Sequence, residues 1–221
     1  MPPNSTNRRE RADVNVSSRL LELGGNVPVY VPVYYDFAST ICYVAHRVMD
    51  RIRDDVDALG IDLVWRPIDL GRLGGWRPGA VVDGAPRENA QRVARELEVA
   101  VRMPPVWLDS RSAHAVAIAL AGTTTEISWR ERVWCAVFEE GRDIGDPAEI
   151  ERLGLDLGID VGALAVGDRV TELRRATDAA RDEGVTGAPT FVLGRFPFAG
   201  IQEPATMLDL LARYVKKQRS P

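Results

Sequence analysis

The stretch "DFASTICY", residues 36–43, decides how the fold of this chain is interpreted. An apolar strand runs up to it, and apolar residues recur at helical spacing after it, from Thr40 as far as Leu59. Gly60 then supplies a stop signal for the helix. Ser39 and Cys42 therefore lie at the start of a predicted helix, directly after a predicted strand.

The strand before this stretch contains two prolines. Valines and tyrosines alternate over residues 27–37, as is typical of a strand. Because Pro28 and Pro32 have no N–H to donate, the regular strand is predicted at about Val33 to Phe37. The segment "IDLVWRPI", residues 61–68, reads as a second strand. Strand, helix and strand together predict a βαβ unit with a right-handed crossover.

The middle of the chain is predicted to be helical. A Gly/Pro-rich loop over residues 71–84 leads into it. Helical patterns follow at 86–100, 110–121, 128–140, 147–157, 160–165 and 168–183. Ser110 is a candidate N-cap, and Gly184 a candidate left-handed stop after the last of these helices.

The end of the chain returns to strands and a final helix. "APTFVLG" and "FPFAG" flank a Gly194-Arg195 turn and predict an antiparallel hairpin, and residues 203–217 form an amphipathic helical pattern. We therefore predict an α/β chain in which a helical domain, residues 70–183, interrupts a domain made of residues 27–69 and 184–221. Residues 1–26 are polar, and we expect a mobile arm.

Composition excludes several classes of function. The chain has 221 residues, 45% of them hydrophobic and 27% charged, with a net charge of −4. These values are those of an ordinary globular protein, and no basic stripe is present, so nucleic-acid or membrane-surface binding is not expected. No apolar stretch is long enough to span a bilayer, and the N-terminus has no hydrophobic signal-peptide region.

The two cysteines favour a reducing compartment. Cys42 and Cys135 lie far apart in the sequence and make no disulfide framework. With two histidines in the chain, no Cys/His set has the spacing of a metal site. We therefore predict a cytoplasmic protein without a bound metal.

The order of elements, with "DFASTICY" and the segment "GVTGAPTF" at residues 184–191, resembles the DsbA-like branch of the thioredoxin superfamily. In that branch a helical domain separates the βαβ half of a thioredoxin fold from its ββα half. The branch includes FrnE-type oxidoreductases, 2-hydroxychromene-2-carboxylate isomerases and kappa-class glutathione transferases. The resemblance also implies a cis peptide bond between Ala188 and Pro189, beside the start of the active-site helix; without it, a strand-entry proline would be the preferred interpretation.

The resemblance gives two different indications of chemistry. Redox members have Cys-Pro-x-Cys at the helix start, and here Ser39 stands at the position of the first cysteine, which leaves no attacking thiolate for dithiol exchange. Isomerase and kappa-class members also have a serine there and take their thiol from glutathione. Thr40 departs from the proline of both groups. The resemblance implies a glutathione-like thiol held by Ser39, Thr40, Ala188 and Pro189.

Other residues have both a structural and a functional interpretation. Cys42 is a candidate catalytic thiol, although burial as a small hydrophobic residue is more common for cysteine. His46 is expected to be a solvated helix residue, Cys135 a packing residue, and Asp36 an acceptor for N–H groups at the helix start. Trp76, Arg77, Trp107 and His114 are candidate substrate-binding residues because the family's helical domain covers the site there; fastening the helical domain to the sheet is the alternative.

Three functional hypotheses follow. The leading one is a thiol-dependent isomerase or transferase that acts on a small, possibly aromatic, organic molecule at Ser39. The second is a FrnE-type thiol-disulfide oxidoreductase with a degenerate site that uses Cys42. The third is a non-catalytic thioredoxin-fold protein that binds a peptide or metabolite. A homodimer is compatible with each of them.

Overall fold

A computed structural model describes residues 27–220, so the predicted mobile arm, residues 1–26, lies outside the described residues. The described chain contains one mixed sheet with the strand order β2-β1-β3-β4. Its strands are β1 (Val29–Tyr35), β2 (Ile61–Pro67), β3 (Thr190–Leu193) and β4 (Phe196–Ala199). β1 pairs with β2 in parallel, and the other two pairings are antiparallel. This is the predicted α/β arrangement, in which the βαβ and ββα halves share one sheet.

β1 is longer at its start than the prolines predicted. It begins at Val29, ends at Tyr35, and keeps its register with β2 through Pro32, which lies level with Val64. On its other side, β1 pairs with β3 at Val33 and Tyr34. A proline is tolerated in the earlier part of β1 because a strand that is paired on one side does not need every N–H in a ladder.

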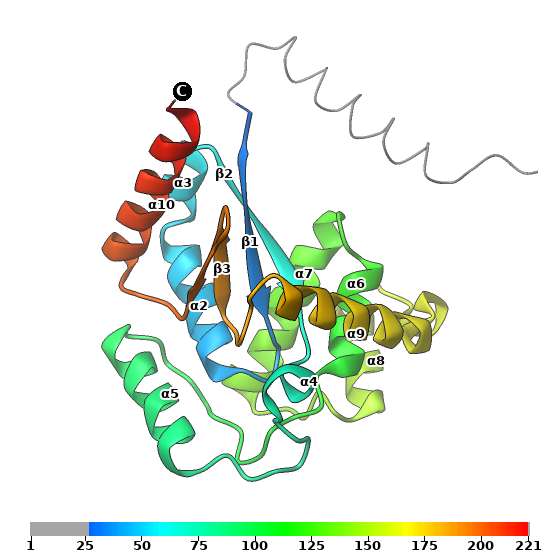
Figure 1. Cartoon of the computed structure of the whole chain (residues 1–221). Helices are drawn as coiled ribbons and strands as arrows, with labels where there is room; N and C mark the ends of the chain where they lie inside the picture. The colour runs from blue at the N-terminus through cyan, green and yellow to red at the C-terminus, as the bar shows by residue number, and fades with distance from the viewer. Residues whose placement is uncertain (1–26, 221) are drawn as a thin grey trace, which may run out of the picture.

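The predicted helix after β1 is broken into two. α2 runs over Thr40–Arg51 and α3 over Arg53–Ala58, with Ile52 between them outside ideal helical geometry at φ −113° and ψ 18°. Both helices, and the C-terminal α10 (Pro204–Arg219), contact one another beside the sheet (Figure 1). The α2 helix therefore begins at the end of the molecule where β1 finishes.

The remaining helices all lie between β2 and β3 in the sequence, as predicted for the helical insertion. They are α4 (Leu70–Gly74), α5 (Gly84–Glu96), α6 (Arg111–Ala119), α7 (Thr124–Cys135), η1 (Ala136–Glu140), α8 (Pro147–Asp156), η2 (Val161–Leu164) and α9 (Val166–Asp182). α5 ends at Glu96 and not at residue 100, and α7 begins at Thr124 and not at residue 128. Two further features were not predicted. α4 occupies part of the expected loop because Asp69 caps it by accepting from Arg72 N, and η1 is a π-helical turn that continues α7.

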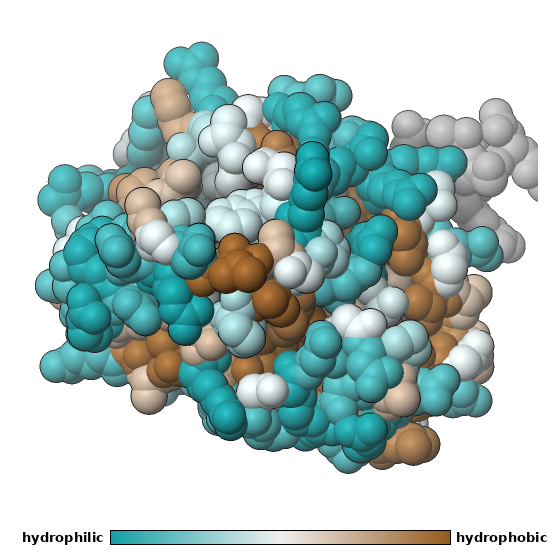
Figure 2. All heavy atoms as spheres, turned by 90° about the horizontal axis from the view of Figure 1, so that it is seen from below, coloured by the Kyte–Doolittle hydropathy of each residue, from teal (hydrophilic) through white to brown (hydrophobic). Residues whose placement is uncertain are grey.

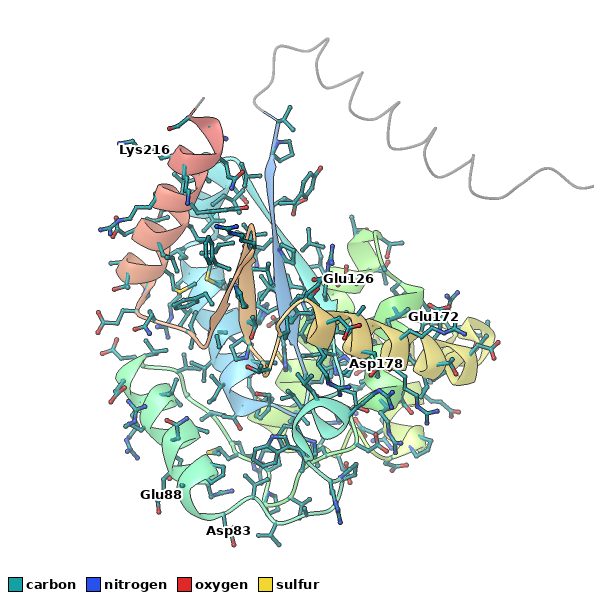
Figure 3. The ribbon with its side chains drawn as sticks, in the orientation of Figure 1. Asp83, Glu88, Glu126, Glu172, Asp178 and Lys216 are labelled. Atoms are coloured by element: carbon teal, nitrogen blue, oxygen red, sulfur yellow. The ribbon has the colours of Figure 1, made fainter. Side chains whose placement is uncertain are left out.

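The core continues from the sheet into the helical insertion. Tyr35 and Phe37, at the end of β1, are fully buried against Trp134 of α7, with ring centroids 5.3 and 5.5 Å apart. On the surface, the ion pair between Arg72 and Asp178 joins α4 to α9; Figure 3 labels Asp178 on α9. The helical part is thus packed against the same end of the sheet from which α2 begins.

Candidate functional site

The turn between β1 and α2 is held by hydrogen bonds from its own backbone. Ser39 N donates to the carbonyl oxygen of Asp36 at 3.1 Å, and Ala38 N donates to Asp36 Oδ1 at 2.9 Å. Ser39 is the N-cap of α2, with extended backbone angles, and its Oγ accepts from Cys42 N at 3.3 Å. The sequence folds this way because a serine hydroxyl satisfies one of the N–H groups that a helix start leaves unpaired.

Several donors at this helix start have no acceptor within residues 27–220. They are the Ser39 hydroxyl, which accepts a bond but donates none, and the N–H groups of Thr40 and Ile41. Ser39 and Thr40 are 7% and 8% exposed, and Ile41 is half-buried. Donors at the positive end of a helix dipole are suited to hold a negatively charged atom.

Cys42 is sealed inside the protein. Its side chain is fully buried, and burial raises the pKa of its thiol to about 12, against the lowering effect of the Ser39 hydrogen bond. A buried thiol with this pKa is almost entirely protonated at neutral pH and is a poor nucleophile. The geometry therefore favours the interpretation of Cys42 as a core residue over that of a reactive thiol.

Asp36 is a fully buried carboxylate beneath the start of α2. Besides Ala38 N, its Oδ1 accepts from Ser110 Oγ at 2.6 Å, and its Oδ2 accepts from Leu70 N at 2.8 Å. Burial works to raise the pKa of this carboxyl, but the hydrogen bonds with His114, Ser110 and Leu70 outweigh it, and the pKa lies below its usual range. The structural role expected for Asp36 is thus extended, because the carboxylate ties β1 to α4 and α6 as well as to α2.

Ser110 is the residue of this network that sequence reasoning did not find. It stands at the N-cap position of α6, as predicted, but its hydroxyl makes no cap hydrogen bond and donates to Asp36 instead. The sequence shows only a small polar residue placed before an apolar helix. Such a residue can cap its own helix or hydrogen-bond to a residue far away in the sequence, and the pattern does not distinguish the two.

The prediction that His114 contacts a substrate is wrong. The side chain is fully buried and stacks on Phe37, with ring centroids 4.7 Å apart. Its Nε2 lies 3.3 Å from both Asp36 Oδ1 and the backbone N of Phe37, whereas its Nδ1 has no hydrogen-bond partner in the described structure. Because α6 packs against the end of β1, His114 supports the site from beneath and does not line its surface.

The loop before β3 lies level with the turn that precedes α2. The Ala188–Pro189 peptide bond is cis, as the resemblance implied. Thr190 pairs with Tyr34 in antiparallel register, and continuing that register places Ala188 level with Asp36. Pro189 is buried and its carbonyl accepts from Gly200 N at 2.8 Å, whereas the partly exposed Ala188 has no backbone hydrogen bond within the described residues. The free N–H and C=O of Ala188 are suited to an extended ligand.

Three of the predicted substrate residues line one pocket at the same end of the molecule. Trp76 and Trp107 stack with ring centroids 4.6 Å apart, and Arg77 lies beside them around a cavity of about 170 Å³. Ser110, which binds Asp36, lines the same cavity. Figure 2 looks onto this end of the molecule and shows hydrophobic side chains gathered near the middle of the face. The pocket therefore combines an aromatic wall with a cation.

His46 and Cys135 differ from their expected settings. His46 is 8% exposed, not solvated, and its Nε2 lies 2.5 Å from Glu131 Oε2. The hydrogen bonds with His46 and Arg47 lower the pKa of Glu131 to about 2. Cys135 is half-buried and contacts Arg47 Nη2 at 3.3 Å, and burial raises the pKa of its thiol to about 12. Tertiary packing of α7 against α2 brings these groups together.

The described residues contain no group of three or more His, Cys, Asp or Glu side chains that could hold a metal ion. None of the described helices is both long enough and apolar enough to cross a membrane.

A family model for the DSBA-like thioredoxin domain matches residues 30–212. The chain belongs to this family. The match includes the Ser39 turn, the helical insertion and the Ala188–Pro189 loop. A search of curated protein sequences finds no match.

Solved structures with the same fold include an isomerase and disulfide-active proteins. A 2-hydroxychromene-2-carboxylate isomerase aligns with a TM-score of 0.67 and 20% identity, over 86% of this chain and 97% of its own. A probable DsbA oxidoreductase from Streptomyces coelicolor aligns with a TM-score of 0.70 and 19% identity, over 87% of this chain and 92% of its own. The cytosolic disulfide reductase DsbM from Pseudomonas aeruginosa, solved with GSH, aligns with a TM-score of 0.60 and 19% identity, over 86% of this chain and 98% of its own. At these identities the likeness establishes the fold.

Proposed function

We propose that this protein is an enzyme that binds glutathione, or a similar low-molecular-weight thiol, at the start of α2 and uses it in isomerisation or transfer on a small organic substrate. The observation that carries the proposal is the contrast between Ser39 and Cys42. Ser39 keeps an unused hydroxyl donor at the helix start, while Cys42 is fully buried with a raised thiol pKa. A site that can hold a thiolate but has no accessible thiol of its own fits an external thiol.

The residues around Ser39 have the chemistry that such a ligand needs. The Ser39 hydroxyl and the N–H groups of Thr40 and Ile41 are available to a sulfur anion, and the helix dipole adds positive potential. Ala188, before the cis-proline Pro189, offers a free backbone donor and acceptor to the peptide part of glutathione. Glutathione, when bound, would supply the sulfur nucleophile for an unsaturated or carbonyl substrate.

The second half of the site would be the aromatic pocket. Trp76 and Trp107 present a stacked wall and Arg77 a cation, which suits an unsaturated organic acid. Ser110 connects this pocket to the turn before Ser39, through the shared carboxylate of Asp36. The 2-hydroxychromene-2-carboxylate isomerase of similar fold supports this substrate class without fixing the molecule.

The experiment is a calorimetric titration with glutathione. We expect saturable binding to the native protein and at least about tenfold weaker binding to Ser39→Ala, because a hydrogen bond to a charged group contributes about 1.5–3 kcal/mol. Ser112→Ala, a change in α6 that removes a hydroxyl outside the site, is the matched control and should bind as the native protein does. Absence of binding to the native protein, or equal affinity of Ser39→Ala, would overturn the proposal.

A thiol-disulfide oxidoreductase that uses Cys42 is the second candidate. The family and its DsbA-type and DsbM neighbours favour it, the latter solved with GSH. It requires Cys42 to become accessible, so fast alkylation of Cys42 in the folded protein would favour this candidate over the first. The third hypothesis is binding without turnover, for which Ser39 and Cys42 would both be replaceable without loss of function.

A further inference from the structure

A second recess lies along α2 and shares no lining residue with the aromatic pocket. It has a volume of about 780 Å³ and is bounded by α2, by the segment 99–102 after α5, and by η1. Its lining includes Tyr43, Arg51, Val99, Val101, Arg102 and Phe138, and we call it the Arg51–Arg102 groove. None of the residues predicted from the sequence to bind a thiol or a substrate lines it.

The groove contains two arginines whose charge is not neutralised. The guanidinium of Arg51 donates to the carbonyl oxygens of Leu97 and Glu98, both at 2.7 Å, and that of Arg102 donates to the carbonyl oxygen of Glu140 at 3.1 Å. Within residues 27–220 neither arginine is paired with a carboxylate. Carbonyl partners hold each guanidinium in place but leave its positive charge available to an anion.

The other charged groups in the groove are already paired. Arg47 forms ion pairs with Glu131 and Glu139, and Asp50 forms one with Arg53. The two carboxylates that line the groove, Asp50 and Glu139, therefore compete weakly for Arg51 and Arg102. A local excess of positive charge remains on a chain whose overall net charge is −4.

The floor of the groove is apolar. Tyr43 and Phe138 stack with ring centroids 4.9 Å apart, Val99 is 8% exposed, and Val101 is half-buried. A groove with an apolar floor and a few placed polar groups is the usual form of a small-molecule site. Planar guanidinium groups bind a carboxylate through paired N–H donors.

We propose that the Arg51–Arg102 groove binds a small organic acid, with its carboxylate on the two arginines and its apolar body over Val99, Val101 and Phe138. Arg51 lies twelve residues along α2 from Ser39, which corresponds to about 18 Å along the helix axis. The groove also includes Tyr43, which is four residues from Ser39, but a small acid whose carboxylate lies on Arg51 does not reach Ser39, so it would occupy a different position from the thiol. The proposal therefore does not depend on thiol binding at Ser39.

The test compares two probes of the same shape by calorimetry. The probes are 2-naphthoate, which carries the carboxylate, and 2-naphthalenemethanol, which is neutral. We expect the native protein to bind naphthoate at one saturable site and more tightly than the alcohol. Arg102→Gln should weaken naphthoate about fivefold or more and change alcohol binding less than about twofold, whereas Arg102→Lys, which keeps the charge but loses the paired N–H donors, should weaken naphthoate less than Arg102→Gln does.

Two further variants complete the test. Arg51→Gln should weaken naphthoate in the same way, but it also removes the bonds to Leu97 and Glu98, so the exposed Arg102 gives the cleaner result. Arg175→Gln removes one exposed arginine of α9 and should leave naphthoate binding unchanged. Naphthoate binding no tighter than that of the alcohol, an unaffected Arg102→Gln, or an equal loss in Arg175→Gln would each overturn the proposal.

Discussion

Asp36→Asn is predicted to lower the free energy of unfolding by about 3 kcal/mol at neutral pH. The native carboxylate accepts hydrogen bonds from Ala38 N, Ser110 Oγ and Leu70 N in a fully buried setting. An asparagine keeps one acceptor oxygen, so its NH₂ group must face one of these donors. One charge-assisted bond, worth about 1.5–3 kcal/mol, is lost, and the others become neutral bonds weaker by about 1 kcal/mol each. The lower desolvation cost of a neutral amide offsets part of the total.

The effect of Asp36→Asn on the free energy of unfolding should depend on pH in a defined direction. The pKa of Asp36 is below its usual range in the folded protein, whereas an unfolded aspartate titrates at about 3.9. The carboxylate therefore contributes its stability above about pH 4 and loses it as the pH falls through the folded pKa. The difference in unfolding free energy between the native protein and Asp36→Asn should be constant between about pH 5 and pH 8 and should shrink below about pH 4.

Urea unfolding followed by tryptophan fluorescence measures this difference, since the chain has five tryptophans. Asp209→Asn is the matched control, because it removes an exposed carboxylate paired with Arg213 on α10 and should cost less than about 1 kcal/mol. A loss below about 1 kcal/mol for Asp36→Asn at neutral pH, or a difference that grows toward acid pH, would refute the reasoning.

Three further predictions concern the thiols and the aromatic pocket. A thiol reagent should modify neither Cys42 nor Cys135 rapidly at neutral pH, because both thiol pKa values are raised to about 12. The same reagent should modify both cysteines in concentrated guanidinium, and fast labelling of the native protein would contradict the prediction. Ser39→Cys should gain insulin-reducing activity with dithiothreitol, since it restores an attacking thiol at the helix start, and activity equal to that of the native protein would count against that geometry. Trp76→Ala should lower the unfolding free energy by about 1 kcal/mol or more through loss of the stack on Trp107, as measured by urea unfolding, and an unchanged midpoint would contradict it.

Local patterns predicted most of the fold. The order of strands and helices, the helical insertion and the hairpin follow from periodicity and turn residues, and the left-handed Gly184 is present after α9. The break at Ile52 has no proline or glycine to announce it. The start of β1 at Val29 depends on which side of the strand is paired, and that information lies in β3, more than 150 residues away.

The site was harder to predict than the fold because its residues come from distant parts of the chain. The spacing of Ser39 and Cys42 across a helix start could be found in one stretch of sequence. The burial of His114 and the bond from Ser110 to Asp36 depend on how α6 packs against β1. The pair of His46 and Glu131 likewise requires α7 beside α2, so a histidine next to Arg47 gave no sign of burial.

The central claim is that the start of α2 stabilises the thiolate of an external thiol. The most direct measurement is the pKa of glutathione's thiol in the complex, followed by the ultraviolet absorbance of the thiolate as the pH is varied. The account predicts a pKa below the value of about 8.5 for a free cysteine thiol in the native protein, and a smaller shift in Ser39→Ala. A bound thiol that titrates as it does in water, or one that titrates identically in both proteins, would contradict it.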